Sequence, residues 1–130
     1  MILTAVAPAE AIIGIWYNTD KSGKIEIYKK DGSYFGKIVW LQDPLDENGE
    51  VAKDKNNPDK SMHTTPLIGL IVMHDFSKDS DGEFKGGNIY DPENGKTYKC
   101  KLKLRGDELD VRGYIGIPTF GRTETWTRVE

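Results

Sequence analysis

Residues 97–104, with the sequence TYKCKLKL, decide the fold class of this chain. Apolar side chains occupy every second position and alternate with a threonine and three lysines, so one face is suited to a core and the other to water. A helix would instead gather apolar residues at spacings of three and four, and that period does not fit. The stretch therefore predicts a β-strand with one buried face.

The same kind of pattern returns along the chain, separated by clusters of Gly, Asn, Asp and Pro that favour turns. Residues 24–29 alternate in this way, and Asp31-Gly32 then supplies a tight turn. Counting residues 97–104, eight strands are predicted, and the other seven cover residues 12–17, 24–29, 33–41, 67–76, 83–90, 109–117 and 120–129.

These strands predict one all-β domain over residues 1–130, an eight-stranded antiparallel up-and-down barrel. The connections are too short for crossover helices, and closing the sheet removes its exposed edges. Eight strands enclose either a packed core or room for one small ligand. Residues 1–11 are interpreted as an N-terminal remnant of an export signal, and residues 8–11 within them as one helical turn that plugs a barrel end.

Residues 42–66 interrupt the strand pattern with a long polar loop rich in turn-forming residues. Long loops in small domains are commonly functional lids or flexible excursions. The acidic residues lack the alternating spacing and the closing Glu of a calcium loop, so we expect a solvated loop and no metal site.

Composition limits the partners. The net charge of -3 offers no broad attraction to nucleic acid. The longest apolar stretch, residues 67–73, is far shorter than the roughly 20 residues of a membrane-spanning helix. Cys100 is the single cysteine, so no internal disulfide forms, and its strand position predicts a small buried side chain.

An enzyme is not expected, and no catalytic residue, metal ligand or cofactor is assigned. The two histidines, His63 and His74, belong to no metal-ligand or nucleophile spacing. Gly86-Gly87 lies inside a strand, where it permits a bend or close packing and does not form a phosphate loop.

Gly14 and Trp16 on the first strand and Arg128 on the last match a pair found in lipocalins and fatty-acid-binding proteins. In that pair the arginine packs across the tryptophan at the closed end of the barrel. A guanidinium on an indole gains cation–π attraction while its donors reach backbone carbonyls. The resemblance implies a lipocalin-like barrel in which the first and last strands are fastened together.

Five longer segments make the chain resemble a bacterial secreted family defined as domain of unknown function 2147. The resemblance runs from about Ile13 to Arg128 and implies a lipocalin-like barrel exported to the periplasm or beyond, with its signal peptide removed. Residues 60–63 depart from the family pattern, which has a Leu-Arg pair after the Asn-Pro-Asp segment, so no role of that arginine is carried over. The segments are 36–40, 56–59, 89–98, 112–116 and 121–128.

Strand alternation predicts which side chains face the lumen. If Trp16 and Arg128 share the inner side, then Glu124 and Arg122 share it too. The same reasoning places eight further side chains inside: Phe120, Trp126, Tyr34, Ile38, Trp40, Phe84, Asn88 and Tyr90. The orientation of His74 is less determined, because its strand is apolar on both faces.

Two interpretations of the inner charges stay open. In the first, Arg122 and Glu124 form an internal ion pair, because a buried charge needs a partner. In the second, the lumen binds a small hydrophobic or amphipathic molecule. Its polar head would be oriented by Arg122 with Tyr90, Asn88 and His74, and its apolar part would rest on Trp40 and Phe84.

A carrier or sensor of a small molecule is therefore the leading prediction. The alternative is a non-catalytic interaction or envelope-associated module with a filled barrel. Exposed apolar residues such as Ile71 or Met73 need a cover, which the long loop, the N-terminal turn or a second copy could supply, so a homodimer stays open.

Overall fold

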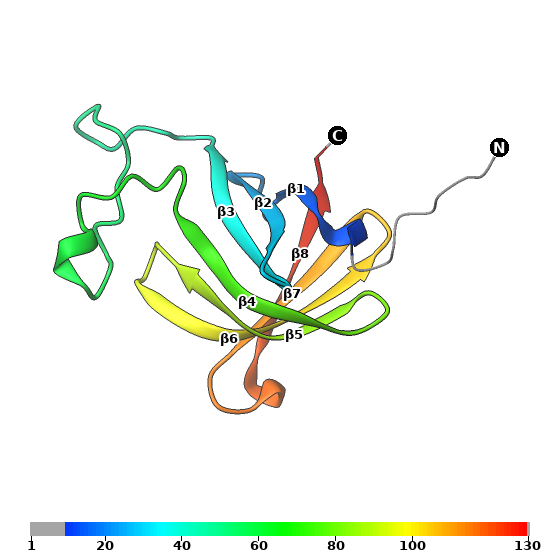
Figure 1. The fold of residues 1–130 in the computed structure, drawn as a ribbon. Coiled ribbons are helices and arrows are strands. Elements are labelled where there is room, and N and C mark those ends of the chain that lie inside the picture. Colours follow the sequence, from blue (N-terminus) through cyan, green and yellow to red (C-terminus); the bar gives the residue numbers. More distant parts are fainter. Residues whose placement is uncertain (1–9, 130) are drawn as a thin grey trace.

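Eight antiparallel strands pair in chain order in the computed structural model, which describes residues 10–129, and the last strand pairs with the first (Figure 1). The predicted eight-stranded up-and-down barrel is thereby confirmed. The strands are β1 (Gly14–Tyr17), β2 (Gly23–Lys30), β3 (Ser33–Leu41), β4 (Ile71–Ser80), β5 (Glu83–Asp91), β6 (Lys96–Arg105), β7 (Glu108–Tyr114) and β8 (Arg122–Arg128). Short 3-10 turns are η1 (Glu10–Ile12), η2 (Lys60–Met62) and η3 (Pro118–Phe120).

Some boundaries differ from the predicted ones. β4 begins at Ile71 and not at residue 67, because residues 67–70 still belong to the long β3–β4 loop (residues 42–70). η3 separates β7 from β8, so Phe120 does not enter the last strand and is 78% exposed. The predicted helical turn over residues 8–11 is found slightly later, as η1, while residues 8 and 9 lie outside the described residues.

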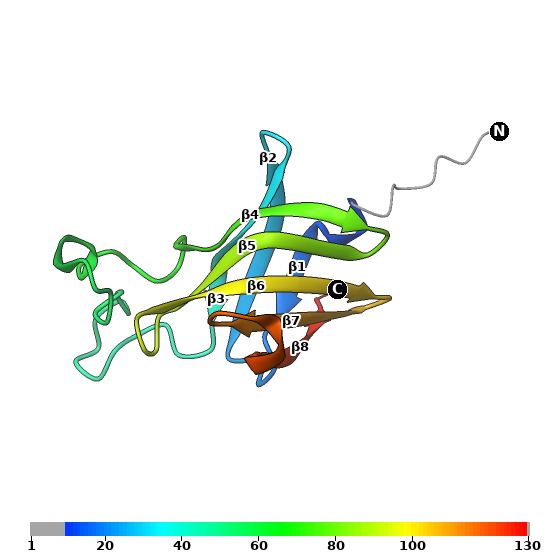
Figure 2. The ribbon, with the colours of Figure 1, turned by 90° about the horizontal axis from the view of Figure 1, so that it is seen from below.

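The two ends of the barrel differ. η1 and the β4–β5 turn lie at one end, and the β3–β4 loop and the β5–β6 turn lie at the other (Figure 1). The view from below shows the same separation (Figure 2). We call the first the closed end and the second the open end.

Trp16 and Arg128 fasten the closed end. They are directly paired residues of β1 and β8, and the Arg128 guanidinium lies 4.2 Å from the centre of the Trp16 ring. Arg128 Nη2 donates to the Ala11 carbonyl at 2.6 Å, and Trp16 Nε1 donates to the Ile12 carbonyl at 2.9 Å. A Cβ on Gly14 would lie 3.2 Å from Arg128 Nη1, so the bare glycine leaves room for the guanidinium. The contact proposed from the resemblance is present.

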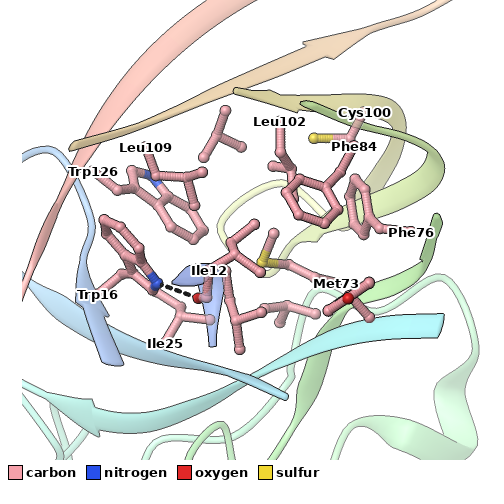
Figure 3. Packing of buried hydrophobic residues seen from close by; sticks show 14 of the residues in the cluster. Ile12, Trp16, Ile25, Met73, Phe76, Phe84, Cys100, Leu102, Leu109 and Trp126 are labelled. Atoms are coloured by element: carbon pink, nitrogen blue, oxygen red, sulfur yellow. Dashed lines mark hydrogen bonds between the residues drawn. The ribbon is translucent and has the colours of Figure 1, made fainter. Parts of the chain in front are cut away.

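The core fills the part of the barrel next to this closed end (Figure 3). Its largest fully buried side chains are Trp16, Phe76 and Phe84, and Ile12 of η1 is fully buried in the same cluster. Cys100 is also buried, and burial, followed by the nearby Glu124 carboxylate, raises the pKa of its thiol to about 12. The thiol therefore stays protonated at neutral pH and serves as a small core side chain.

β-Bulges change which side chains face the core. Phe84 pairs with Leu102 but Gly87 pairs with Cys100, so β5 has one residue more than β6 in this interval. Gly86 lies in this bulge with φ +78°, a backbone conformation that residues other than glycine adopt only with strain. Gly87 then faces inward beneath the ring of Phe76. The expected bend and close packing are divided between the two glycines.

Gly87→Ala should destabilise the barrel by about 1–3 kcal/mol, the usual cost of overpacking a core. A Cβ at this position would lie 2.5 Å from the Phe76 ring. Urea denaturation measures the effect. In a Phe76→Leu background, where the ring is absent, the added penalty of Gly87→Ala should be clearly smaller; an equal penalty in both backgrounds would show that the ring is not the cause.

Candidate functional site

A cavity of about 700 Å³ occupies the open end of the barrel. Its inner wall is apolar, and its polar residues come from the turns and strand ends that surround the opening. The inner wall includes Ile25, Ile38, Val72, Ile89, Val111 and Trp126. The surrounding residues include Asn18, Thr19, Asp20, Tyr90, Asp91, Glu93, Arg122 and Glu124. This division suits a molecule with an apolar body and a polar head.

Trp126 is the largest apolar side chain of the inner wall. It is 5% exposed and is directed from β8 into the barrel (Figure 3). Its Nε1–H is buried and has no hydrogen-bond partner within the described part of the chain. Buried donors without a partner are rare in folded proteins and cost about 1–3 kcal/mol.

Arg122 and Glu124 line the cavity, as predicted, but at its opening and not in a dry interior. Both side chains are solvent-exposed, because β8 begins at Arg122. Among the described residues no ion pair joins them; Glu124 Oε1 instead accepts a hydrogen bond from Thr19 Oγ1 at 3.3 Å. The predicted internal ion pair is wrong, since water solvates both charges.

Trp40 lies on the outer surface, and its predicted inward orientation is wrong. Ile25 pairs with Ile38, but Lys24 pairs with Trp40, so Val39 is an extra residue in β3. Beyond this bulge the alternation is reversed, and Leu41 lines the cavity in place of Trp40. Trp40 is 37% exposed, with the Lys24 Nζ 4.7 Å from its ring centre.

The bulge at Gly86 reverses the predicted orientations in the second half of β5. Asn88 is exposed on the outer face, and Ile89 lines the cavity instead. Phe84, on the other side of the bulge, is buried as predicted, but it packs against Tyr34 in the core and does not line the cavity.

His74 and Asn88 line a second, more open hollow of about 650 Å³ on the outer face of the barrel. The β3–β4 loop forms its other side through Met62, Ile68 and Leu70. His74 Nε2 is 3.1 Å from the Ile71 carbonyl. Tyr90 lies at the boundary and lines both hollows, so the predicted set of ligand contacts is divided between two places.

The β3–β4 loop is anchored to the barrel by Asp54, which the sequence did not single out. Asp54 is 1% exposed. Its Oδ1 accepts from the Tyr90 hydroxyl at 2.7 Å, and its Oδ2 accepts from Asn57 Nδ2 at 2.8 Å. Asn56 Nδ2 donates to the carbonyls of Pro92 and Glu93, both at 3.0 Å. Most of residues 42–66 are exposed, in line with the expected solvated loop, and the anchor at Asp54 is what the sequence did not predict.

A partial signal for this anchor was present in the sequence. Two of the segments that carry the family resemblance, 56–59 and 89–98, are the ones that these bonds join. Asp54 itself is one acidic residue among many in the loop, and nothing in its spacing distinguishes it.

Tyr90→Phe should loosen the loop and cost about 1–3 kcal/mol, because the Asp54 carboxylate loses a buried donor. Hydrogen exchange of the Asp54 and Leu67 amides, which bond to Thr65 and Ala52, measures the local effect. Tyr28→Phe is the control, since Tyr28 stacks on Phe35 on the outer face. Equal protection in Tyr90→Phe and wild type would contradict the anchoring role.

The same hydrogen bond predicts a dependence on alkaline pH. Partial burial and the bond to Asp54 raise the pKa of Tyr90 from 10.0 to about 12. The protonated phenol is the stabilising form, so its contribution is complete below pH 10.0 and is lost as the pH rises towards about 12. Ultraviolet titration of wild type and Tyr90→Phe should show one late-titrating tyrosine that the variant lacks.

The described residues offer no group of three or more His, Cys, Asp or Glu side chains able to hold a metal ion. Within residues 10–129, no helix has the length and apolar character needed to cross a membrane. His63 lies in the loop, with Nε2 2.6 Å from the Asn57 carbonyl, whereas His74 lies on β4.

Comparison with known proteins identifies a family for this chain. The model of a family described as uncharacterized protein conserved in bacteria (DUF2147) matches residues 14–128. The chain belongs to this family. The match runs from β1 to β8, so it includes both Trp16 and Arg128 of the closed end and the whole β3–β4 loop.

A solved structure supports the fold of this DUF2147 member. Protein HP1028 from the human pathogen Helicobacter pylori, described as belonging to the lipocalin family, superimposes with a TM-score of 0.82 at 24% identity. The match covers 92% of this chain and 83% of HP1028. Among curated proteins, no sequence matches the chain. The similarity establishes a lipocalin-like barrel.

Proposed function

We propose that this protein binds a small hydrophobic or amphipathic molecule in the barrel lumen and does not catalyse a reaction. The cavity of about 700 Å³ at the open end supports the proposal. Its volume lies within the range of roughly 300–1,000 Å³ that small-molecule sites occupy. Lipocalin-like barrels offer such an interior at one end while the other end is sealed.

The apolar part of the ligand would contact Ile38, Val111 and Trp126, and its polar head would lie between Arg122 and Glu124. Tyr90 also lines the opening and connects it to the anchored loop. Trp40, His74, Phe84 and Asn88 do not line this cavity, so the proposal does not include them.

Native mass spectrometry of protein purified from bacterial cells tests the proposal. We expect a mass excess that disappears after extraction with organic solvent. The extracted protein should then increase the fluorescence of phenylnaphthylamine, a neutral apolar probe. Protein without a mass excess that also fails to bind the probe would contradict the proposal.

We further propose that the protein acts in the periplasm or outside the cell, where a carrier would meet molecules in transit. Osmotic-shock fractionation of the bacterial host should release it with periplasmic marker proteins. Recovery with cytoplasmic markers would contradict this location. Homodimerisation stays a prediction that sedimentation velocity can test.

A second candidate function is binding to another protein or to the cell envelope. One observation favours it: the segment between β7 and β8 exposes Ile115 (65%), Ile117 (54%) and Phe120 (78%). Apolar residues gathered in this way commonly mark interaction sites. If this segment carries the function, Phe120→Ser should abolish capture of a partner and leave probe binding in the lumen unchanged.

A further inference from the structure

The β7–β8 segment (residues 115–121) leaves large apolar side chains in contact with water. Ile115 and Phe120 are the two most exposed large apolar residues of the described chain, and Ile117 in the same segment is 54% exposed. None of the three belongs to the core cluster. In both ribbon views the segment projects from the barrel, apart from the β3–β4 loop (Figure 1, Figure 2). It therefore forms an apolar tip on the surface of the described residues.

The sequence of this region is uncharged between two arginines. Residues 113–121 read GYIGIPTFG, with Arg112 before them and Arg122 after them. Both arginines lie at the base of the segment, where β7 and β8 pair, since Arg122 is directly opposite Gly113. Apolar residues flanked by basic ones suit the surface of a membrane, where the apolar part meets acyl chains and the basic part meets phosphates.

β6 adds two lysines beside this segment. Lys99 is paired with Tyr114, the last residue of β7, and Lys101 is paired with Arg112. Both lysines are exposed and flank the buried Cys100, so they lie on the outer face of the strand. Directly paired residues share a face, which places Arg112 beside Lys101. The outer face next to the apolar tip is therefore basic.

Acidic residues do not cancel this charge. Farther along the same face of β7, Asp110 and Glu108 both contact Arg105, whose Nη2 and Nη1 lie 2.8 and 3.3 Å from their carboxylate oxygens. Glu93 and Glu124 line the cavity instead. The face beside the segment can thus attract anions although the net charge of the chain is -3.

We propose that the β7–β8 segment docks on an anionic membrane surface. Its three apolar side chains enter the boundary between headgroups and acyl chains, and the basic side chains of β6 and β7 contact lipid phosphates. This inference rests on the second candidate function and names its partner. A second copy of the chain is a poorer occupant, because a symmetric contact would bring two basic faces together.

Co-sedimentation with lipid vesicles at low salt tests the proposal. We expect the protein to bind vesicles that contain phosphatidylglycerol at least about tenfold more tightly than vesicles of phosphatidylcholine alone. This difference should shrink at high salt, which screens exposed charges. Absence of binding to the anionic vesicles would overturn the lipid partner.

Ile117→Ser and Leu45→Ser form a matched pair for the apolar contact. Both side chains are 54% exposed, and Leu45 lies in the β3–β4 loop, outside the segment. Ile117→Ser should weaken binding to the anionic vesicles about tenfold, the effect of losing one large apolar contact. Leu45→Ser should leave binding unchanged. Equal effects of the two substitutions would contradict docking through the segment.

Lys101→Gln and Lys30→Gln form a matched pair for the charge. Each removes one positive charge from an exposed strand residue, but Lys30 lies on β2, which is not a neighbour of β6 or β7. Lys101→Gln should weaken binding to the anionic vesicles about threefold to fivefold, and Lys30→Gln should change it little. An equal loss in both variants would show that only net charge matters and would overturn the assigned face.

The outcomes also separate this inference from the functions proposed above. Phenylnaphthylamine binding by a protein that does not bind vesicles would overturn the lipid partner and leave lumen binding intact. Capture of a protein that Phe120→Ser abolishes, without vesicle binding, would overturn the lipid partner and leave the second candidate function. Self-association in sedimentation velocity that Phe120→Ser abolishes, again without vesicle binding, would identify a second copy as the occupant.

Discussion

Trp16→Ala should reduce the free energy of unfolding by about 3–5 kcal/mol, the usual loss when a large aromatic residue is removed from a core. Trp16 is 0% exposed, it donates to the Ile12 carbonyl, and Arg128 lies across its ring. The substitution removes these contacts together and opens the junction between β1 and β8. Urea denaturation followed by circular dichroism measures the loss. Because small domains are stable by only about 5–15 kcal/mol, this loss is a large share of the total stability and should lower the midpoint of thermal unfolding.

Trp40→Ala is the matched control for this prediction. It makes the same chemical change on the outer surface of the barrel, where the Trp40 side chain is 37% exposed. The expected loss is about 1 kcal/mol. Equal losses for the two substitutions would contradict the assignment of Trp16 to the sealed end and of Trp40 to the outer surface.

Val111→Phe should reduce probe binding at least about tenfold, which equals about 1.4 kcal/mol. Val111 is buried in the wall of β7 and lines the cavity, so the larger side chain would occupy space that the ligand needs. Stability should stay equal or rise slightly, since filling a cavity often stabilises a fold. Fluorescence titration and urea denaturation measure the two effects separately.

Val51→Phe controls for the added phenyl ring, because Val51 is 50% exposed in the β3–β4 loop. Its probe affinity should equal that of wild type. If Val111→Phe binds the probe as well as Val51→Phe does, the probe does not occupy the lumen.

The sequence was sufficient to predict the strands and their closure. The alternation in residues 97–104 arises from one buried and one wet face, and it is found intact in β6. The Trp16–Arg128 contact could be expected because the resemblance named both residues, and the register of β1 and β8 places them opposite each other. The alternation of apolar and polar residues within strands, together with the Trp16–Arg128 pair, was enough to predict the strands and the closure of the barrel.

The site was predicted less well, because bulges reverse the alternation on which the orientations were based. Trp40 and Asn88 were placed on the wrong side by the extra residues at Val39 and Gly86. Val72 and Met73 are both buried for the same reason, since Gly36 pairs with Met73 while Lys37 pairs with Ile71. A bulge is fixed by the pairing of two strands, which the pattern of one strand does not contain.

The position of Asp54 depends on contacts between distant segments. Its partner Tyr90 lies on β5, and the two meet only after the loop folds back against this strand. Arg122 and Glu124 were correctly expected along the lumen, but the exact start of β8 determines that they lie at its opening.

The indole resonances in a proton–nitrogen correlation spectrum test most directly that the lumen is the binding site. The chain has three tryptophans in different settings: Trp16 bonded to Ile12, Trp40 on the outer surface, and Trp126 without a partner in the cavity wall. On saturation with decanol we expect the Trp126 indole signal to shift clearly, because this ring lines the cavity, with the Trp16 and Trp40 signals nearly unchanged. An unchanged Trp126 signal, or a shift confined to Trp40, would contradict binding inside the barrel.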